Sequence, residues 1–165
     1  MFHVLKSPWE NTLSAPFVII EDSDEDFYVF LRALKNLEPD LESRYPLLRF
    51  REGDEALDYL LRQEEYHSLE APLPVALLLD LNLPGTDGRE IIQEIKQNST
   101  LQPIPIIVLT TSSSPRDIET CYRHGANSYI LKPMGAAKMQ QTVQLLFQYW
   151  FHLTILPIIH DQFMS

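Results

Sequence analysis

Five short apolar segments, separated by stretches with helical periodicity, constrain the fold of this chain more than any other feature of its sequence. The segments are Phe17–Ile20, Leu47–Phe50, Val75–Leu79, Ile104–Leu109 and Tyr129–Leu131. Three of them consist largely of Val, Ile and Leu, which is the pattern of strands that are buried on both faces. We therefore expect five short strands, most of them inside the protein.

The stretches between these segments predict helices, because apolar residues recur in them at intervals of three and four. Pro115–His124 also has end signals, since Ser114 can cap its start, Pro115 suits the first helical position and Gly125 suits its end. The predicted helices are Phe27–Leu37, Ala56–Leu61, Ile91–Ile95, Pro115–His124 and Ala136–Phe151. Five alternations of strand and helix predict an α/β protein with a parallel sheet covered by helices on both faces.

Composition excludes several classes of function. The formal net charge is −10 and no basic run occurs, so we expect no nucleic-acid partner, because phosphate backbones require clustered Lys and Arg. The longest apolar-rich segment, Leu145–Ile159, is interrupted by polar residues and is too short to span a membrane. Cys121 is the only cysteine and the start lacks a signal-peptide pattern, so we predict a reducing, cytoplasmic location.

Polar side chains follow the predicted strands at their carboxyl ends. Glu21 and Asp22 follow the first strand, Asp80 the third, Thr110 the fourth and Lys132 the fifth. Ligands of doubly wound sheets bind at this edge. Neighbouring carboxylates repel one another unless a cation lies among them, and Mg²⁺ prefers oxygen ligands. We therefore predict a Mg²⁺ site in which one carboxylate can attack phosphorus while the metal and Lys132 neutralise the phosphoryl oxygens.

Four motifs at these strand ends resemble the signature set of response-regulator receiver domains. The motifs are Glu21-Asp22-Ser23, Asp80–Gly88, Leu109–Ser112 and Lys132-Pro133. The resemblance runs from Phe17 to about Trp150 and implies a flavodoxin-like, doubly wound five-stranded parallel sheet in the order 2-1-3-4-5, with five helices. We predict an N-terminal extension over residues 1–15, a receiver domain over 16–151 and a C-terminal tail over 152–165.

The resemblance assigns an acceptor and a metal site. Asp80 would be the phosphoacceptor. Glu21 and Asp22 would form the acidic pair, with Asp22 binding Mg²⁺ directly and Glu21 acting through water, and Asn82 would supply its backbone carbonyl to the metal. The acidic residues 24–26 that follow are interpreted as a solvated helix start that complements the helix dipole.

The resemblance also assigns a switch. Thr110 would be the hydroxyl that moves to bond the phosphoryl group, and Lys132 would form an ion pair with that group. Tyr129 lies where the family has a rotating switch aromatic, although core packing explains a tyrosine there nearly as well. The Lys132–Pro133 peptide bond would be cis.

Within the family, residues 21–27, 80–90 and 109–118 are most similar to cyanobacterial receivers that pair with phytochrome histidine kinases and have no output domain. The resemblance implies a phosphoacceptor switch, not an enzyme. It would take a phosphoryl group from a histidine kinase in a Mg²⁺-dependent reaction, assist its own phosphorylation and dephosphorylation, and signal through protein contacts.

The last predicted helix carries more apolar surface than one packed face requires. Met139, Val143, Leu146 and Trp150 form one stripe. Further apolar side chains come from Leu145, Phe147, Phe151, Leu153, Ile155 and Leu156. Surplus of this size is typical of a protein interface, so we predict a homodimer through this helix and the tail to about Ile159. The alternative is a tail that folds back over its own domain.

Two other functions fit parts of the pattern. A haloacid-dehalogenase-type phosphatase also forms an aspartyl phosphate after a buried strand, but it needs a second aspartate as general acid where this chain has Asn82. A receiver-shaped module that no longer takes phosphate would be indicated by loss of Asp22, Asp80 or Lys132, and all three are present.

Overall fold

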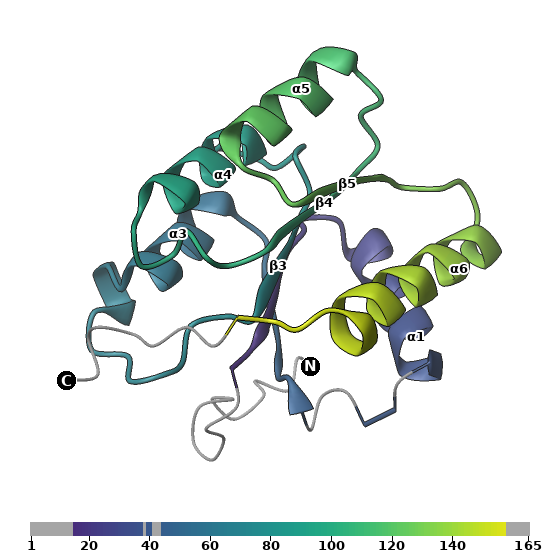
Figure 1. The fold of residues 1–165 in the computed structure, drawn as a ribbon, viewed down its shortest axis with the longest axis horizontal. Helices are drawn as coiled ribbons and strands as arrows, with labels where there is room; N and C mark the ends of the chain where they lie inside the picture. The colour runs from purple at the N-terminus through teal and green to yellow at the C-terminus, as the bar shows by residue number, and fades with distance from the viewer. Residues whose placement is uncertain (1–14, 38, 41–43, 158–165) are drawn as a thin grey trace.

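Five parallel strands form one twisted sheet in the order β2-β1-β3-β4-β5 (Figure 1). The computed structural model describes residues 15–37, 39–40 and 44–157. The strands are β1 (Phe17–Ile20), β2 (Leu47–Phe50), β3 (Ala76–Leu79), β4 (Ile106–Thr110) and β5 (Ser128–Leu131). The order and the direction of every strand pair confirm the predicted flavodoxin-like fold.

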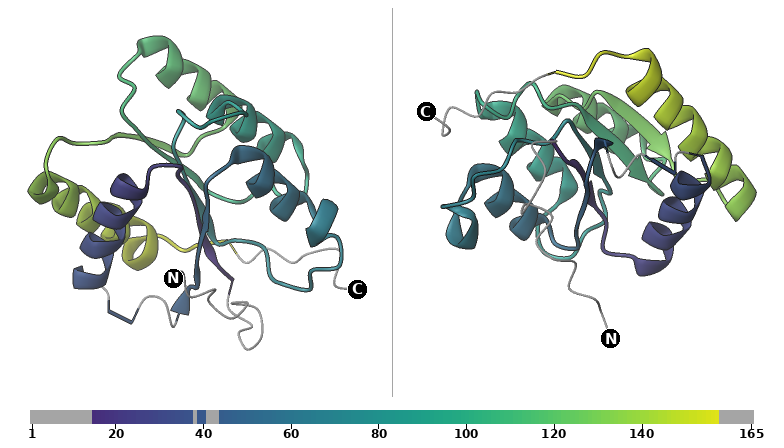
Figure 2. Two further views of the ribbon diagram at one scale, coloured as in Figure 1. Left: turned by 180° about the vertical axis from the view of Figure 1, so that it is seen from behind. Right: turned by 90° about the horizontal axis from the view of Figure 1, so that it is seen from below.

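Helices cover both faces of this sheet, as the strand–helix alternation predicts. The helices are α1 (Asp24–Leu37), α3 (Gly53–Leu61), α4 (Gly88–Gln97), α5 (Pro115–His124) and α6 (Ala136–Phe147), with the short helices η1 (Glu64–Tyr66) and η2 (Gln148–Leu153). Helices α3, α4 and α5 lie on one face, and α1 and α6 lie side by side on the other (Figures 1 and 2).

The two faces of β1 belong to two separate hydrophobic clusters, because successive side chains of a strand point to opposite faces. Val18 and Ile20 pack with residues of α3 and α4. Phe17 and Ile19 pack with residues of α1 and α6. All four side chains are buried, which explains why the strand is apolar at every position and does not alternate with polar residues.

Helix α5 begins and ends where its sequence signals predict. The Ser114 hydroxyl accepts a hydrogen bond from the backbone N–H of Asp117 at 3.4 Å, and Pro115 occupies the first turn. Gly125 ends the helix with φ +106°, a left-handed conformation that glycine adopts without steric cost.

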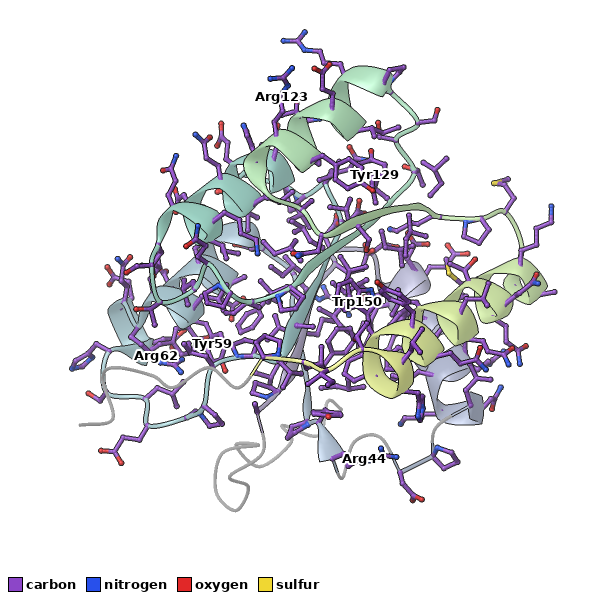
Figure 3. All side chains as sticks on the ribbon, in the orientation of Figure 1. Arg44, Tyr59, Arg62, Arg123, Tyr129 and Trp150 are labelled. Carbon is purple, nitrogen blue, oxygen red and sulfur yellow. The ribbon has the colours of Figure 1, made fainter. Side chains whose placement is uncertain are left out.

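The end of the last helix differs from the prediction. Regular α-helix stops at Phe147 and continues as the π-helical segment η2, after which the Thr154 hydroxyl donates to the carbonyl of Trp150 at 2.8 Å. Trp150 lies near the end of α6 and packs against the same hydrophobic cluster as Phe151 and Leu156 (Figure 3). Part of the apolar surplus is therefore buried within the chain.

Two of the predicted regions extend beyond the residues that the structure describes. Of the predicted N-terminal extension, the structure describes only Ala15, and residues 1–14 lie outside the described range. The end of the predicted tail, residues 158–165, also lies outside it. Within the described ranges, none of the helices combines the length and hydropathy that a membrane crossing would need.

Candidate functional site

The candidate site lies where the strand order reverses. The chain passes from β1 outward to β2 and returns to β3 on the other side of β1, so the carboxyl ends of β1 and β3 border a crevice. The sheet ladder fixes the backbone on both sides of it. The Glu21 N–H donates to the Phe50 carbonyl, and the Asp80 N–H donates to the Ile20 carbonyl, each at 3.0 Å.

Three carboxylates meet in this crevice. Glu21, Asp22 and Asp80 each have an oxygen within 4.8 Å of the others. Glu21 and Asp80 are only 7% exposed, and burial raises the pKa of Glu21 despite the opposing effect of the nearby Lys132. Buried carboxylates at this spacing need a cation among them, and an all-oxygen donor set is the kind that Mg²⁺ or Mn²⁺ takes. The residues that would hold a divalent cation are therefore present and close together.

Lys132 brings a positive charge into the same cluster. Its Nζ donates to Asp80 Oδ2 at 2.8 Å and to Glu21 Oε2 at 2.6 Å. Burial lowers the pKa of Lys132, but its hydrogen bonds to carboxylates outweigh that effect and raise the pKa above its ordinary value. The ammonium is charged at neutral pH and offsets part of the negative charge of the crevice.

A fourth carboxylate, which the sequence interpretation placed in solvent, also contacts this ammonium. Asp26 Oδ2 accepts from Lys132 Nζ at 2.7 Å, and the Asp26 side chain is 39% exposed. The interpretation of the whole acidic run as a solvated helix start is therefore wrong for Asp26. The first turn of α1 faces the crevice at this position, while the neighbouring Glu25 is exposed.

Asn82 and Thr110 lie on the β3–β4 side of Asp80. The Asn82 backbone N–H donates to Asp80 Oδ1 at 3.2 Å, and its side-chain amide donates to the Thr110 hydroxyl at 3.5 Å. Thr110 is fully buried, and its hydroxyl also accepts from the Ser112 N–H at 3.4 Å. Asn82 thus bridges the acidic crevice and the end of β4.

Tyr129 is connected to this strand end through Ser112. Its hydroxyl donates to the Ser112 carbonyl at 2.9 Å, and its ring packs against the cluster beneath α4 and α5 (Figure 3). The Ser112 hydroxyl donates to Asp117 at 2.6 Å, and Asp117 pairs with Arg89 of α4 at 2.6 Å. A polar chain therefore joins β4, β5, α4 and α5, and the sequence motifs did not predict its Asp117–Arg89 part.

The prediction of a cis peptide bond before Pro133 is wrong. No cis peptide bond occurs among the described residues, so the Lys132–Pro133 bond is trans. The trans form is the more stable one for an X–Pro bond by about 0.5–1 kcal/mol. Lys132 still reaches the crevice, because its backbone N–H donates to the Thr110 carbonyl at 2.7 Å and keeps it beside β4.

Arg49 of β2 is a supporting residue that the sequence reasoning missed. Its guanidinium donates to the backbone carbonyls of Glu21 at 3.0 Å and Asp22 at 3.3 Å, and lies 4.3 Å from the centre of the Phe27 ring. It also pairs with Asp24 at 2.7 Å. These contacts fix the turn between β1 and α1. Only a parallel β1–β2 register could have indicated them, because Arg49 lies 28 residues from Glu21.

Comparison with known proteins identifies a family match over most of the chain. The family model described as the response regulator receiver domain matches residues 18–144. Response regulator Rcp1 of Synechocystis sp. is 37% identical over 140 residues, which cover 85% of this chain and 91% of Rcp1. The probable methanogenesis regulatory protein FilR2 of Methanothrix harundinacea is 37% identical over 137 residues, covering 82% of this chain and 84% of that protein.

Two solved structures share the fold at comparable identity. The phosphorylated cyanobacterial phytochrome response regulator RcpA matches with a TM-score of 0.78 and 34% identity, covering 87% of this chain and 99% of RcpA. The Mn²⁺-bound form of Rcp1 matches with a TM-score of 0.77, the same identity and the same coverage of both chains.

Proposed function

The chain belongs to the response regulator receiver family, and on that basis we propose that it is a phosphorylation switch whose acceptor is Asp80. The observation that carries this proposal is the contact of Lys132 with Asp80 inside a cluster of three carboxylates. A carboxylate held beside an ammonium and other oxygen ligands is suited to receive a phosphoryl group. Two findings support the proposal: RcpA was solved in a phosphorylated form, and the matches to RcpA and Rcp1 extend over most of this chain and most of each relative.

The residues of the crevice have separable roles in this transfer. An oxygen of Asp80 forms the new bond to phosphorus as the P–N bond of a phosphohistidine breaks, and the bonding electrons return to the imidazole, which takes up a proton. Lys132 donates hydrogen bonds to phosphoryl oxygens. Asp22, Asp80 and the Asn82 backbone carbonyl would hold Mg²⁺, with Glu21 acting through water, and the ion would neutralise phosphoryl charge when bound. The Mn²⁺-bound form of Rcp1 supports this assignment.

The signal leaves the site through Thr110 and Tyr129. Thr110 is positioned to exchange its hydrogen bond from Asn82 for one to a phosphoryl oxygen. That movement would disturb the N–H of Ser112, whose carbonyl accepts from Tyr129. A rotation of Tyr129 would then change the surface formed by α5 and β5, where a partner protein can bind.

The donor is a histidine kinase, and a phytochrome kinase is the one we favour because RcpA is a phytochrome response regulator. Such kinases draw their phosphoryl group from ATP, so the reaction belongs in the cytoplasm. Dephosphorylation uses the same crevice, with water as the acceptor, and the protein assists both reactions without acting on a separate substrate.

Intact-protein mass spectrometry after incubation with Mg²⁺ and a small phosphodonor tests the acceptor. The native protein should gain one phosphoryl group, while Asp80→Asn or an added chelator should abolish the gain, because the nucleophile or the cation is then missing. Asp22→Asn keeps the acceptor but removes a proposed metal ligand, so it should need more Mg²⁺. Labelling of Asp80→Asn to the native extent would contradict the assignment.

A homodimer through the end of α6 and the segment after it is a second part of the proposal. Leu145 is 60% exposed, Leu153 is 74% exposed and Ile155 is almost fully exposed, although neighbouring apolar residues are buried. These exposed side chains do not belong to the apolar face that packs against the sheet. A second copy of the chain would remove them from water.

Light scattering at micromolar concentration tests this dimer. The native protein should have twice the mass of one chain, and Leu153→Asp should return it to the monomer mass, because a charge buried in an apolar interface is strongly unfavourable. Met134→Asp is the matched control, since Met134 is also an apolar residue and is 90% exposed but lies in the loop between β5 and α6. A native monomer would favour the alternative of a tail folded on its own domain.

A further inference from the structure

We infer that Asp26 is a positioning residue that competes with the phosphoryl group for the Lys132 ammonium and so weakens phosphoryl binding at Asp80. The inference rests on the proposed function, because it describes how the same site is regulated.

Each N–H donor of Lys132 already has an acceptor. An ammonium group has three N–H donors, and the carboxylates of Glu21, Asp26 and Asp80 accept from Lys132 Nζ at 2.6, 2.7 and 2.8 Å. A phosphoryl oxygen can therefore receive a full hydrogen bond from Lys132 only when one of these carboxylates releases its own.

Asp26 is the carboxylate that can be released most easily. Asp80 carries the phosphoryl group itself, and Glu21 is buried and also accepts from the Ser23 N–H at 3.0 Å. The Asp26 side chain is partly exposed, so water can solvate it after release, whereas a released Glu21 would remain a buried, unpaired charge. The Asp26 backbone stays in place meanwhile, because its N–H donates to the Ser23 hydroxyl at 3.2 Å.

This arrangement predicts that the charge of Asp26 opposes the phosphorylated state. While the contact between Asp26 and Lys132 persists, it holds one N–H donor of the ammonium away from the phosphoryl group, and the loss of this ion pair is subtracted from the affinity for that group. Asp26→Asn keeps the size and the carbonyl acceptor but removes the charge, so Lys132 should move to a phosphoryl oxygen more readily.

The test measures the affinity for beryllium trifluoride, an anionic mimic of the phosphoryl group, at saturating Mg²⁺. We expect Asp26→Asn to bind it about fivefold more tightly than the native protein does, which is the scale of one partly exposed ion pair. Glu25→Gln is the matched control, because it removes the same charge from the preceding residue of the same helical turn, where the side chain is exposed. Its affinity should stay native.

A double-mutant cycle shows whether Asp26 acts through the lysine. In a Lys132→Met background the Asp26→Asn gain should disappear, since there is no ammonium to compete for. In Lys132→Arg it should shrink, because a guanidinium has five N–H donors and can serve all acceptors at once. The Arg variant decides the question if the Met variant does not fold.

Two results would overturn the inference: equal affinities for Asp26→Asn and Glu25→Gln, or a gain of undiminished size when Lys132 is replaced. Failure of the proposed function looks different. In that case neither the native protein nor the Asp26→Asn variant would bind beryllium trifluoride or gain a phosphoryl group.

Discussion

Lys132→Met is expected to lower the free energy of unfolding by about 3 kcal/mol at neutral pH in the absence of divalent cations, because it leaves buried carboxylates without a countercharge. Glu21 and Asp80 are 7% exposed and both accept hydrogen bonds from the Lys132 ammonium. Methionine fills a similar volume, so the loss measures charge and hydrogen bonding more than packing. Urea denaturation followed by circular dichroism gives the value.

Lys138→Met is the control for this prediction, because it removes the same charge from an exposed position on α6. It should change stability by less than about 0.5 kcal/mol. Saturating Mg²⁺ should restore much of the loss in Lys132→Met, because a cation that binds only the folded protein stabilises it. An equal, small effect of both substitutions would show that the crevice carboxylates are solvated well enough to need no partner.

The pH dependence of Lys132→Met has a definite sign. Burial already raises the pKa of Glu21 in the native protein, and loss of the ammonium should raise it further. A carboxyl whose folded pKa exceeds its unfolded pKa binds more protons when folded, so it favours folding at low pH and loses that contribution as the pH rises through the folded pKa. The stability deficit of the variant should therefore shrink as the pH is lowered from neutral toward the ordinary pKa of glutamate.

Phe147→Ala is expected to destabilise the protein by about 3–5 kcal/mol, the usual cost of deleting a buried aromatic side chain and leaving a cavity. Phe147 is 1% exposed, and its ring stacks on Phe151 at 4.8 Å between centroids. It also meets the edge of Phe17 at 5.7 Å. This cluster joins the end of α6 to β1, so its loss should loosen η2 as well as lower the overall stability.

Gln144→Ala provides the comparison, because Gln144 lies in the same helix but is exposed. Its effect on the free energy of unfolding should be within about 0.5 kcal/mol of zero. Amide hydrogen exchange in Phe147→Ala should accelerate most in η2 and the end of α6. Uniform acceleration across the whole sheet would instead mean that this cluster is part of the global core.

Local patterns in the sequence determined the elements and the edge of the sheet that carries the chemistry. Runs such as Ala76–Leu79 are apolar throughout because both faces of a central parallel strand are buried, and this burial leaves a direct signature in the order of residues. Polar residues that follow such runs must meet at one edge, since all strands point the same way. The order of residues is therefore sufficient to select Asp22, Asp80 and Lys132 as candidates.

The tertiary structure alone decided which side chains touch. Asp26 and Glu25 are indistinguishable as members of an acidic run, yet the rotation of α1 against the sheet brings only Asp26 to Lys132, 106 residues away. The apolar residues after Val143 likewise divide into buried Phe147 and exposed Leu153 according to where α6 turns into η2. Such contacts depend on helix orientation and on long-range packing, which periodicity and motif spacing do not encode, because they describe only the neighbours along the chain.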